Sequence, residues 1–170
     1  MLKSRYRYKP KGLHRERGRL VNKKKGGFKF PPKGAQDNEP TPAPLYDVLV
    51  KELGYKDVCL GPEKFDALKE LWPNHSYCNP PYSIKALFVD AAVRSNEEGS
   101  EVLLYLPFDP STGWFHKLFD RNPLIIFFLR PPKHARYPVA LIDLDFYPRP
   151  EVKFIKNLQE LKELLPPPPL

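Results

Sequence analysis

Four consecutive residues, Asn79-Pro80-Pro81-Tyr82, combine groups that could grip a planar ring bearing an amino group. Adjacent prolines are poor inside a sheet or a helix, so they favour a rigid, extended turn that exposes backbone carbonyls. Asn79 adds a side-chain oxygen that accepts hydrogen bonds, and Tyr82 adds an aromatic surface for stacking. With two oxygens holding the two amino hydrogens, the nitrogen lone pair would face an electrophile. No general base is needed beforehand, because the proton can leave after the attack.

The elements that must position this turn can be read from the hydrophobic pattern. Strands are predicted at 55–60, 75–78, 101–106, 124–129 and 139–146, and helices at 45–53, 63–71, 83–96, 114–119 and 152–165. Strands that alternate with helices predict an α/β fold with a mostly parallel sheet and helices on both faces. The last two strands could form an antiparallel pair at one edge. Ligands of such folds bind at the carboxyl ends of the strands, which is where the proline turn lies.

Three polar residues near these elements have predicted structural roles. Ser83 is expected to be the N-cap of the helix over 83–96. Asp143 and Asp145 alternate with apolar residues, so we expect both on the exposed face of an edge strand.

The two cysteines, Cys59 and Cys78, fall in apolar strands and are predicted to be buried thiols. Together with His75 and His116 they match no usual zinc spacing, so no metal site is predicted. No apolar run approaches the ~20 residues that cross a bilayer. The charged N-terminus does not resemble a secretion signal. We therefore expect an intracellular protein without a membrane-spanning segment.

Charge divides the chain unevenly. Residues 1–34 hold 13 basic side chains and one acidic one, whereas residues 35–170 hold 15 basic and 19 acidic ones. This balance excludes a uniformly basic, histone-like protein. It predicts a basic arm over 1–34 that cannot fold alone, a domain over 35–165 and a proline tail over 166–170. Cations interleaved with aromatic rings favour nucleic-acid binding over a merely solvated tail. The candidate nucleic-acid contacts are Arg5, Arg7, Lys23, Lys24, Lys25, Lys133, Arg136 and Trp114.

An ordered set of short motifs resembles a known family. The motifs are Thr41-Pro42, Asp57-Val58-Cys59, Phe65-Asp66-Ala67-Leu68 with Trp72, Tyr77-Cys78-Asn79-Pro80-Pro81-Tyr82-Ser83, Leu104-Tyr105-Leu106-Pro107 and Trp114-Phe115-His116. Over about residues 39–147 the chain resembles the small phage-type DNA N6-adenine methyltransferases, which use S-adenosylmethionine.

This resemblance implies a Rossmann-like methyltransferase fold, S-adenosylmethionine as cofactor and DNA as partner, with the target adenine extruded from the duplex. The implied catalytic residues are Asn79, Pro80, Pro81 and Tyr82, and the implied cofactor-binding residues are Asp57, Cys59, Thr41, Pro42 and Asn79. A viral source would place the protein in the host cytoplasm.

Two other functions stay open. No glycine-rich loop follows the first strand, and Asp57 lies only 22 residues before Asn79. This short interval suggests a nucleic-acid-binding protein with a decayed methyltransferase domain. The same proline turn also serves methyltransferases that act on RNA bases or on glutamine side chains.

Overall fold

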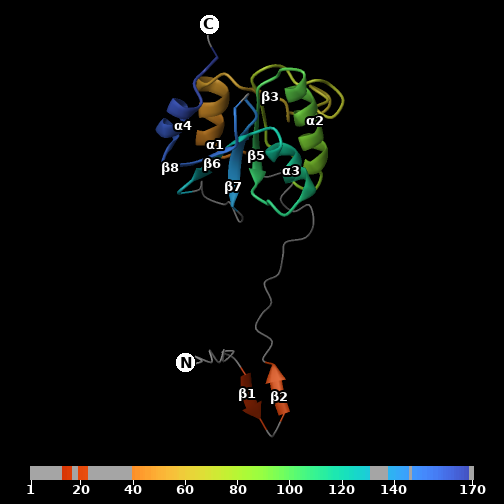
Figure 1. Ribbon diagram of the computed structural model, residues 1–170, viewed down its shortest axis with the longest axis vertical. Coiled ribbons are helices and arrows are strands. Elements are labelled where there is room, and N and C mark those ends of the chain that lie inside the picture. Colours follow the sequence, from red (N-terminus) through yellow and green to blue (C-terminus); the bar gives the residue numbers. More distant parts are fainter. Residues whose placement is uncertain (1–12, 17–18, 23–39, 131–137, 146, 169–170) are drawn as a thin grey trace, which may run out of the picture. The chain divides into compact units, whose positions relative to one another are not determined.

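The computed structural model describes residues 13–16, 19–22, 40–130, 138–145 and 147–168. The chain divides into one unit of residues 1–32 and another of residues 33–170. Within the first unit, β1 (Leu13–Glu16) and β2 (Arg19–Asn22) pair as an antiparallel hairpin, drawn in red in Figure 1. The sequence analysis predicted a basic arm that cannot fold alone, and it did not include these two strands.

The larger unit is built on a six-stranded sheet with the order β3-β4-β5-β7-β6-β8. Its strands are β3 (Lys56–Asp57), β4 (Ser76–Cys78), β5 (Val102–Pro107), β6 (Leu124–Phe128), β7 (Val139–Asp143) and β8 (Glu151–Ile155). Among these six strands, β7 alone runs opposite to the others. The predicted α/β class is confirmed. The predicted antiparallel pairing of the last two predicted strands is confirmed, because β6 and β7 pair antiparallel. Their predicted position at an edge is wrong, because β5 lies beyond β7 and the edge strand β8 lies beyond β6.

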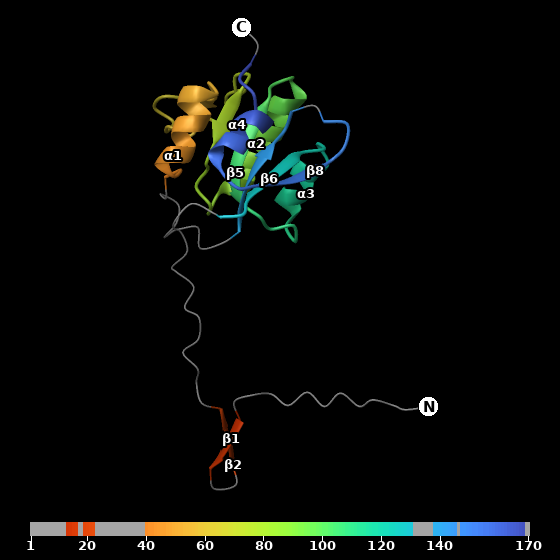
Figure 2. The same cartoon turned by 90° about the vertical axis from the view of Figure 1, so that its left-hand side faces the viewer.

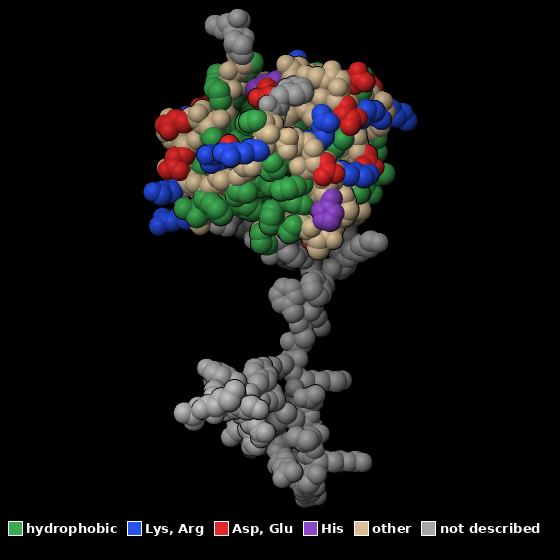
Figure 3. Space-filling view, viewed as in Figure 1, with side chains coloured by type: hydrophobic (Ala, Val, Ile, Leu, Met, Phe, Trp, Pro, Cys, Tyr) green, Lys and Arg blue, Asp and Glu red, His purple; other side chains and the backbone are tan. Residues whose placement is uncertain are grey.

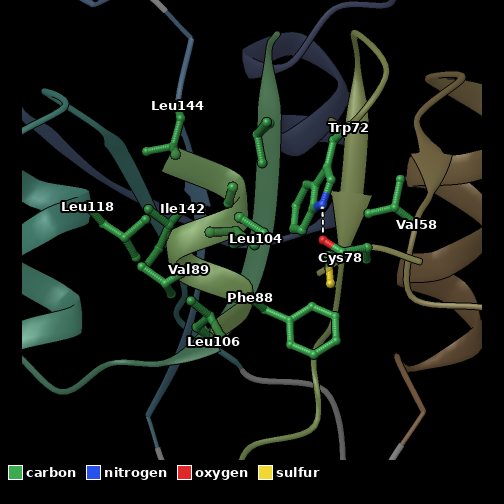
Figure 4. Packing of buried hydrophobic residues seen from close by; sticks show 14 of the residues in the cluster. Val58, Trp72, Cys78, Phe88, Val89, Leu104, Leu106, Leu118, Ile142 and Leu144 are labelled. Atoms are coloured by element: carbon green, nitrogen blue, oxygen red, sulfur yellow. Dashed lines mark hydrogen bonds between the residues drawn. The ribbon is translucent and has the colours of Figure 1, made fainter. Parts of the chain in front are cut away.

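Helices cover both faces of the sheet (Figures 1 and 2). They are α1 (Ala43–Tyr46), which continues as the wider π-helix η1 (Asp47–Glu52), then α2 (Lys85–Glu97), α3 (Gly113–Phe119) and α4 (Leu158–Leu164). Side chains alternate between the faces of a strand, so Leu104 and Leu106 of β5 join one core and Leu103 and Tyr105 join the other. Figure 4 shows the first core, where α2 and α3 pack on the sheet.

The helix predicted over 63–71 is wrong, because two successive turns occupy this segment. Lys64 and Phe65 donate backbone hydrogen bonds to the carbonyl of Gly61, and the Asp66 carboxylate accepts from the amide of Leu68 at 3.3 Å. An aspartate that bonds the nearby backbone in this way competes with helical hydrogen bonding. Trp72 follows the turns and is anchored in the core by donating Nε1–H to the Ala67 carbonyl at 2.7 Å (Figure 4).

The single helix predicted over 152–165 is also wrong, because the segment forms β8 and then α4. Asn157 separates the two by capping α4, since its side-chain oxygen accepts from the amides of Gln159 and Glu160.

Val152 and Phe154 share one face of β8 and are exposed, and Phe154 stacks on Phe127 of β6 with 5.5 Å between ring centroids. Figure 3 shows hydrophobic side chains gathered on the molecular face that carries α3 in this view.

Two of the polar assignments are also corrected. The N-cap of α2 is Ile84 rather than Ser83, and no side chain caps this helix. Asp143 is 1% exposed because β7 lies inside the sheet, whereas Asp145 beyond the strand is exposed as predicted. In the described part of the chain, the helices are all too short or too polar to cross a bilayer.

Candidate functional site

The carboxyl ends of β3 and β4 bring two candidate residues to one edge of the sheet. Asp57 ends β3, and Asn79 directly follows β4. These strands are parallel neighbours in which Asp57 pairs with Tyr77. Asn79 therefore lies two residues beyond that pair, although 22 residues separate it from Asp57 along the chain. Although the interval between Asp57 and Asn79 is short, the parallel pairing of β3 with β4 brings both residues to one edge of the sheet.

The side chain of Asn79 is held by a residue from a distant segment. Its Nδ2 donates to Thr41 Oγ1 at 3.2 Å, and Thr41 Oγ1 lies 2.6 Å from the hydroxyl of Tyr77. Thr41 immediately precedes Pro42, the N-cap of α1. The structure thus joins the start of α1, the strand β4 and the proline turn through one small polar network.

The carboxylate of Asp57 is shaped by its immediate neighbours. Its Oδ1 accepts from the backbone amide of Cys59 at 2.9 Å, which bends the chain just after β3. The Tyr46 side chain of α1 approaches the same carboxylate. Burial raises the pKa of the Tyr46 phenol, and the charge of Asp57 and a hydrogen bond to it raise that pKa further. Asp57 is thereby a half-buried acid set between α1 and the end of β3.

The proline turn is only partly free of intrachain partners. The carbonyl of Pro81 accepts from the amide of Ile84 at 3.2 Å, and the carbonyl of Tyr82 accepts from Lys85 Nζ at 3.0 Å. Among the described residues, none donates to the carbonyl of Pro80. The expectation that the turn leaves its backbone carbonyls exposed is therefore wrong for Pro81 and Tyr82, whose carbonyls accept hydrogen bonds within the chain. The carbonyl of Pro80 remains suited to accept a hydrogen from a ligand.

Lys85 ties the turn to a third element. Besides reaching the Tyr82 carbonyl, its Nζ lies 5.5 Å from the ring centroid of Trp114 in α3. Trp114 is half-buried and its ring meets Phe115 edge-on, with centroids 6.0 Å apart. The candidate nucleic-acid contact Trp114 therefore lies close to Lys85, the first residue of the helix after the proline turn.

Cys59 and Cys78 are joined by a disulfide, so their assignment as buried thiols is wrong. Cys59 follows β3 and Cys78 ends β4, with 5.4 Å between their Cα atoms. Parallel pairing of β3 and β4 explains the approach of two cysteines 19 residues apart. The bond links the two strand ends beside Asp57 and Asn79.

The other candidate nucleic-acid contacts fall outside the described residues. These are Arg5, Arg7, Lys23, Lys24, Lys25, Lys133 and Arg136. In the ranges that the structure does describe, His, Cys, Asp and Glu side chains form no group of three that could hold a metal ion.

Three residues of this edge were missed by the sequence reasoning. Tyr77 could have been found, because a residue two positions before Asn79 shares its face of an extended strand. Lys85 could have been found from its position at the start of the helix after the turn. Tyr46 carried no such signal, because its proximity to Asp57 arises only when α1 packs on the sheet.

Comparison with known proteins gives one family match and one curated relative. The family model described as DNA N-6-adenine-methyltransferase (Dam) matches residues 31–157. A DNA N-6-adenine-methyltransferase of Escherichia phage T1 is 36% identical over 77 residues, which is 41% of this chain and 31% of the phage protein. The chain thus spans about a third of the length of that relative. No solved structure gives a significant match.

Proposed function

Since this chain belongs to the DNA N-6-adenine-methyltransferase (Dam) family, we propose that it transfers a methyl group to the N6 amino group of adenine in DNA. The observation that carries the proposal is the family match across a segment that contains Asn79-Pro80-Pro81-Tyr82 at the carboxyl edge of the sheet. The finer fold assignment, a Rossmann-like methyltransferase fold, belongs to the same proposal. It is supported by the parallel strands β3, β4 and β5 and by their shared ligand-binding edge.

The proposed chemistry relies on two oxygens and one ring. The side-chain oxygen of Asn79 and the carbonyl oxygen of Pro80 accept the two hydrogens of the adenine amino group, and Pro81 keeps the turn rigid. Tyr82 stacks on the adenine ring. These contacts draw electron density toward the nitrogen and aim its lone pair at the methyl donor. When bound, S-adenosylmethionine would supply the methyl group and keep the electron pair of the broken carbon–sulfur bond, and the amino nitrogen of adenine would release a proton to solvent.

The residues present fit S-adenosylmethionine, which supplies an electrophilic methyl group when bound. Its sulfonium and ammonium groups are cationic, and Asp57 offers a half-buried carboxylate at the edge where Asn79 lies. Asp57, Pro42 and Asn79 are the residues that we propose would hold the cofactor at this edge. Cys59 contributes through its backbone amide, which orients Asp57, rather than through its thiol.

DNA binding is assigned to the basic arm together with Lys133, Arg136 and Trp114, since cations neutralise phosphates and rings stack on bases. Extruding the target adenine costs a few kcal/mol, which these contacts must offset. We place this activity inside the cell, in the host cytoplasm if the source is a virus.

The test is methyl transfer from isotope-labelled S-adenosylmethionine to four acceptors. They are duplex DNA, the same DNA with hypoxanthine replacing adenine, RNA of the same sequence and a glutamine-containing peptide. We expect N6-methyladenine in the first acceptor alone, identified by mass spectrometry after digestion. Asn79→Ala should lower the rate by about 10³-fold, because it removes an acceptor whose effect is greatest in the transition state. Gln159→Ala on α4 is the control and should leave the rate unchanged. Transfer to RNA or peptide would redirect the substrate assignment, and an active Asn79→Ala protein would refute the mechanism.

A second candidate function is favoured by one observation. The segment between Asp57 and β4 consists of turns rather than an additional strand and helix, so the protein offers few groups for the far end of the cofactor. A decayed domain that only binds nucleic acid would show no S-adenosylmethionine binding by calorimetry at millimolar ligand. It would still show salt-dependent affinity for DNA.

A further inference from the structure

Two hydroxyls, one from the half-buried Thr41 and one from the buried Tyr77, lie next to the side chain of Asn79, on which the proposed reaction depends most. Thr41 Oγ1 accepts from Asn79 Nδ2 at 3.2 Å and lies 2.6 Å from the hydroxyl of Tyr77. Thr41 lies 38 residues before Asn79, whereas Tyr77 precedes it by two residues on β4. Two positions apart on an extended strand, Tyr77 and Asn79 share one face, and that face is the one covered by α1 and η1.

We propose that Thr41 and Tyr77 are positioning residues that fix the orientation of the Asn79 amide for methyl transfer. The inference rests on the proposed function and deepens it. A carboxamide has an oxygen end and an NH₂ end of nearly equal shape, and a half-turn exchanges them. With the nitrogen bonded to Thr41, the oxygen occupies the opposite end. In the exchanged orientation the amide would present donors to the amino group of adenine, which also donates.

The surroundings of the two hydroxyls make them a rigid and uncharged support. Tyr77 is 1% exposed, and burial raises the pKa of its phenol far above neutrality, so the hydroxyl keeps its proton. Its backbone pairs with Asp57 on one side and Leu103 on the other. Thr41 is followed by Pro42, whose carbonyl accepts from the amide of Tyr46 at 2.9 Å in the first turn of α1. Neither hydroxyl can move far without disturbing the sheet or the helix.

This role differs measurably from the cofactor contact that the family resemblance implies for Thr41. A residue that covers the cofactor affects cofactor affinity, whereas a residue that orients Asn79 affects the rate at saturating cofactor. The two roles can therefore be separated by measuring kcat and the dissociation constant of S-adenosylmethionine in the same variants.

The experiment compares Thr41→Val and Tyr77→Phe, which remove the hydroxyls at nearly constant shape, with Thr41→Ser, which keeps one. We expect kcat to fall about ten- to hundredfold in the first two, because small misplacements of a reacting group are costly. Thr41→Ser should stay within about threefold of the wild type. Cofactor affinity, measured by calorimetry, should be unchanged in all three. Unchanged kcat in Thr41→Val and Tyr77→Phe, or weaker cofactor binding with normal kcat, would overturn the inference.

Two controls exclude a merely structural effect. Tyr55→Phe removes another buried phenol, which donates to Glu101 Oε1 at 2.8 Å, and it should lower Tm while leaving kcat unchanged. In Asn79→Asp both ends of the side chain are oxygens, so orientation no longer matters. Adding Thr41→Val to that variant should change its residual rate by less than about twofold. An additive effect in this background would contradict the orienting role.

The inference and the proposed function fail differently. A wild-type protein that transfers no methyl group refutes the proposed function, and the inference falls with it. An active wild type whose Thr41 and Tyr77 variants are equally active refutes the inference alone. The side-chain amide signals of Asn79 in nitrogen–proton correlation spectra give a readout that needs no turnover. They are identified by their loss in Asn79→Asp and should shift in Thr41→Val.

Discussion

The two ends of the sheet carry polar clusters of opposite character. At the carboxyl edge, hydrogen bonds join the uncharged side chains of Thr41, Tyr77 and Asn79, beside the carboxylate of Asp57. At the other end, where β4 and β5 begin, His75, Glu101, Tyr55, Asp143 and Tyr147 form what we call the amino-end cluster, which contains two carboxylates. Neutral hydroxyls can orient a side chain without adding charge to the site where we propose that a cationic cofactor binds. We therefore expect changes at the carboxyl edge to affect catalysis and changes at the amino end to affect stability.

The amino-end cluster includes a buried acid that is incompletely paired. Asp143 Oδ2 accepts from the Tyr147 hydroxyl at 2.7 Å, whereas Oδ1 has no partner among the described residues. Burial raises the pKa of Asp143 from 3.8 to about 7. The folded protein thus holds this proton more tightly than the unfolded chain does. The stability it contributes is fully present below pH 3.8 and is lost as the pH rises through 7.

The largest effect is expected for Asp143→Asn, which should remove the part of the pH dependence of folding stability that comes from this buried acid. Between pH 4 and pH 8 the wild-type free energy of unfolding should fall by up to about 4 kcal/mol more than that of the variant. Chemical denaturation across this pH range measures the difference. Asp145→Asn, an exposed neighbour, is the control and should retain the wild-type profile. A kcat that changes in Asp143→Asn at a pH where both proteins are folded would break the division between the two ends.

His75 gives the second test, because it is the most completely paired residue of the amino-end cluster. Its Nδ1 lies 2.9 Å from Glu101 Oε2, its Nε2 lies 2.8 Å from the carbonyl of Leu53, and its ring stacks on Tyr55 with centroids 3.7 Å apart. His75→Ala should lower the free energy of unfolding by about 3 kcal/mol. The shorter side chain leaves a cavity, and the Glu101 carboxylate and the Leu53 carbonyl each lose their hydrogen bond to the imidazole ring.

Urea unfolding and kcat measured on the same samples of His75→Ala check this expectation. His116→Ala, which changes an exposed histidine of α3, is the matched control and should alter neither quantity by much. A stability loss below about 1 kcal/mol would mean that the amino-end cluster does not stabilise the fold as its contacts indicate.

Features that depend on neighbouring residues could be predicted from the sequence, whereas features that depend on distant segments could not. The Asn79 turn, the strand before it and the helix after it follow from local patterns: two prolines, an apolar run and helical spacing. The inner position of β7 does not, because strand order depends on contacts between segments far apart in the chain. The aspartate at 143 was therefore expected to be exposed. β8 was missed because the helical spacing of Leu158, Leu161 and Leu165 was extended back to residue 152. The alternation of residues in β8 is too short to predict a strand against that pattern. The bond between Thr41 and Asn79 spans 38 residues and has no local signal.

The smallest effect is expected at the carboxyl edge, for a substitution of Lys85, which donates a hydrogen bond to the turn. Lys85→Met keeps the aliphatic stem but removes the charge that reaches the Tyr82 carbonyl and the Trp114 ring. We expect kcat/KM for DNA to fall about three- to tenfold, since a cation over an aromatic ring contributes about 1 kcal/mol. Stability should change by less than about 0.5 kcal/mol, because Lys85 is not part of either core. Lys117→Met on α3 is the control for charge alone. If Lys85→Met instead lowered Tm and left kcat/KM intact, the carboxyl edge would share the stabilising role of the amino end, and the division between them would fail.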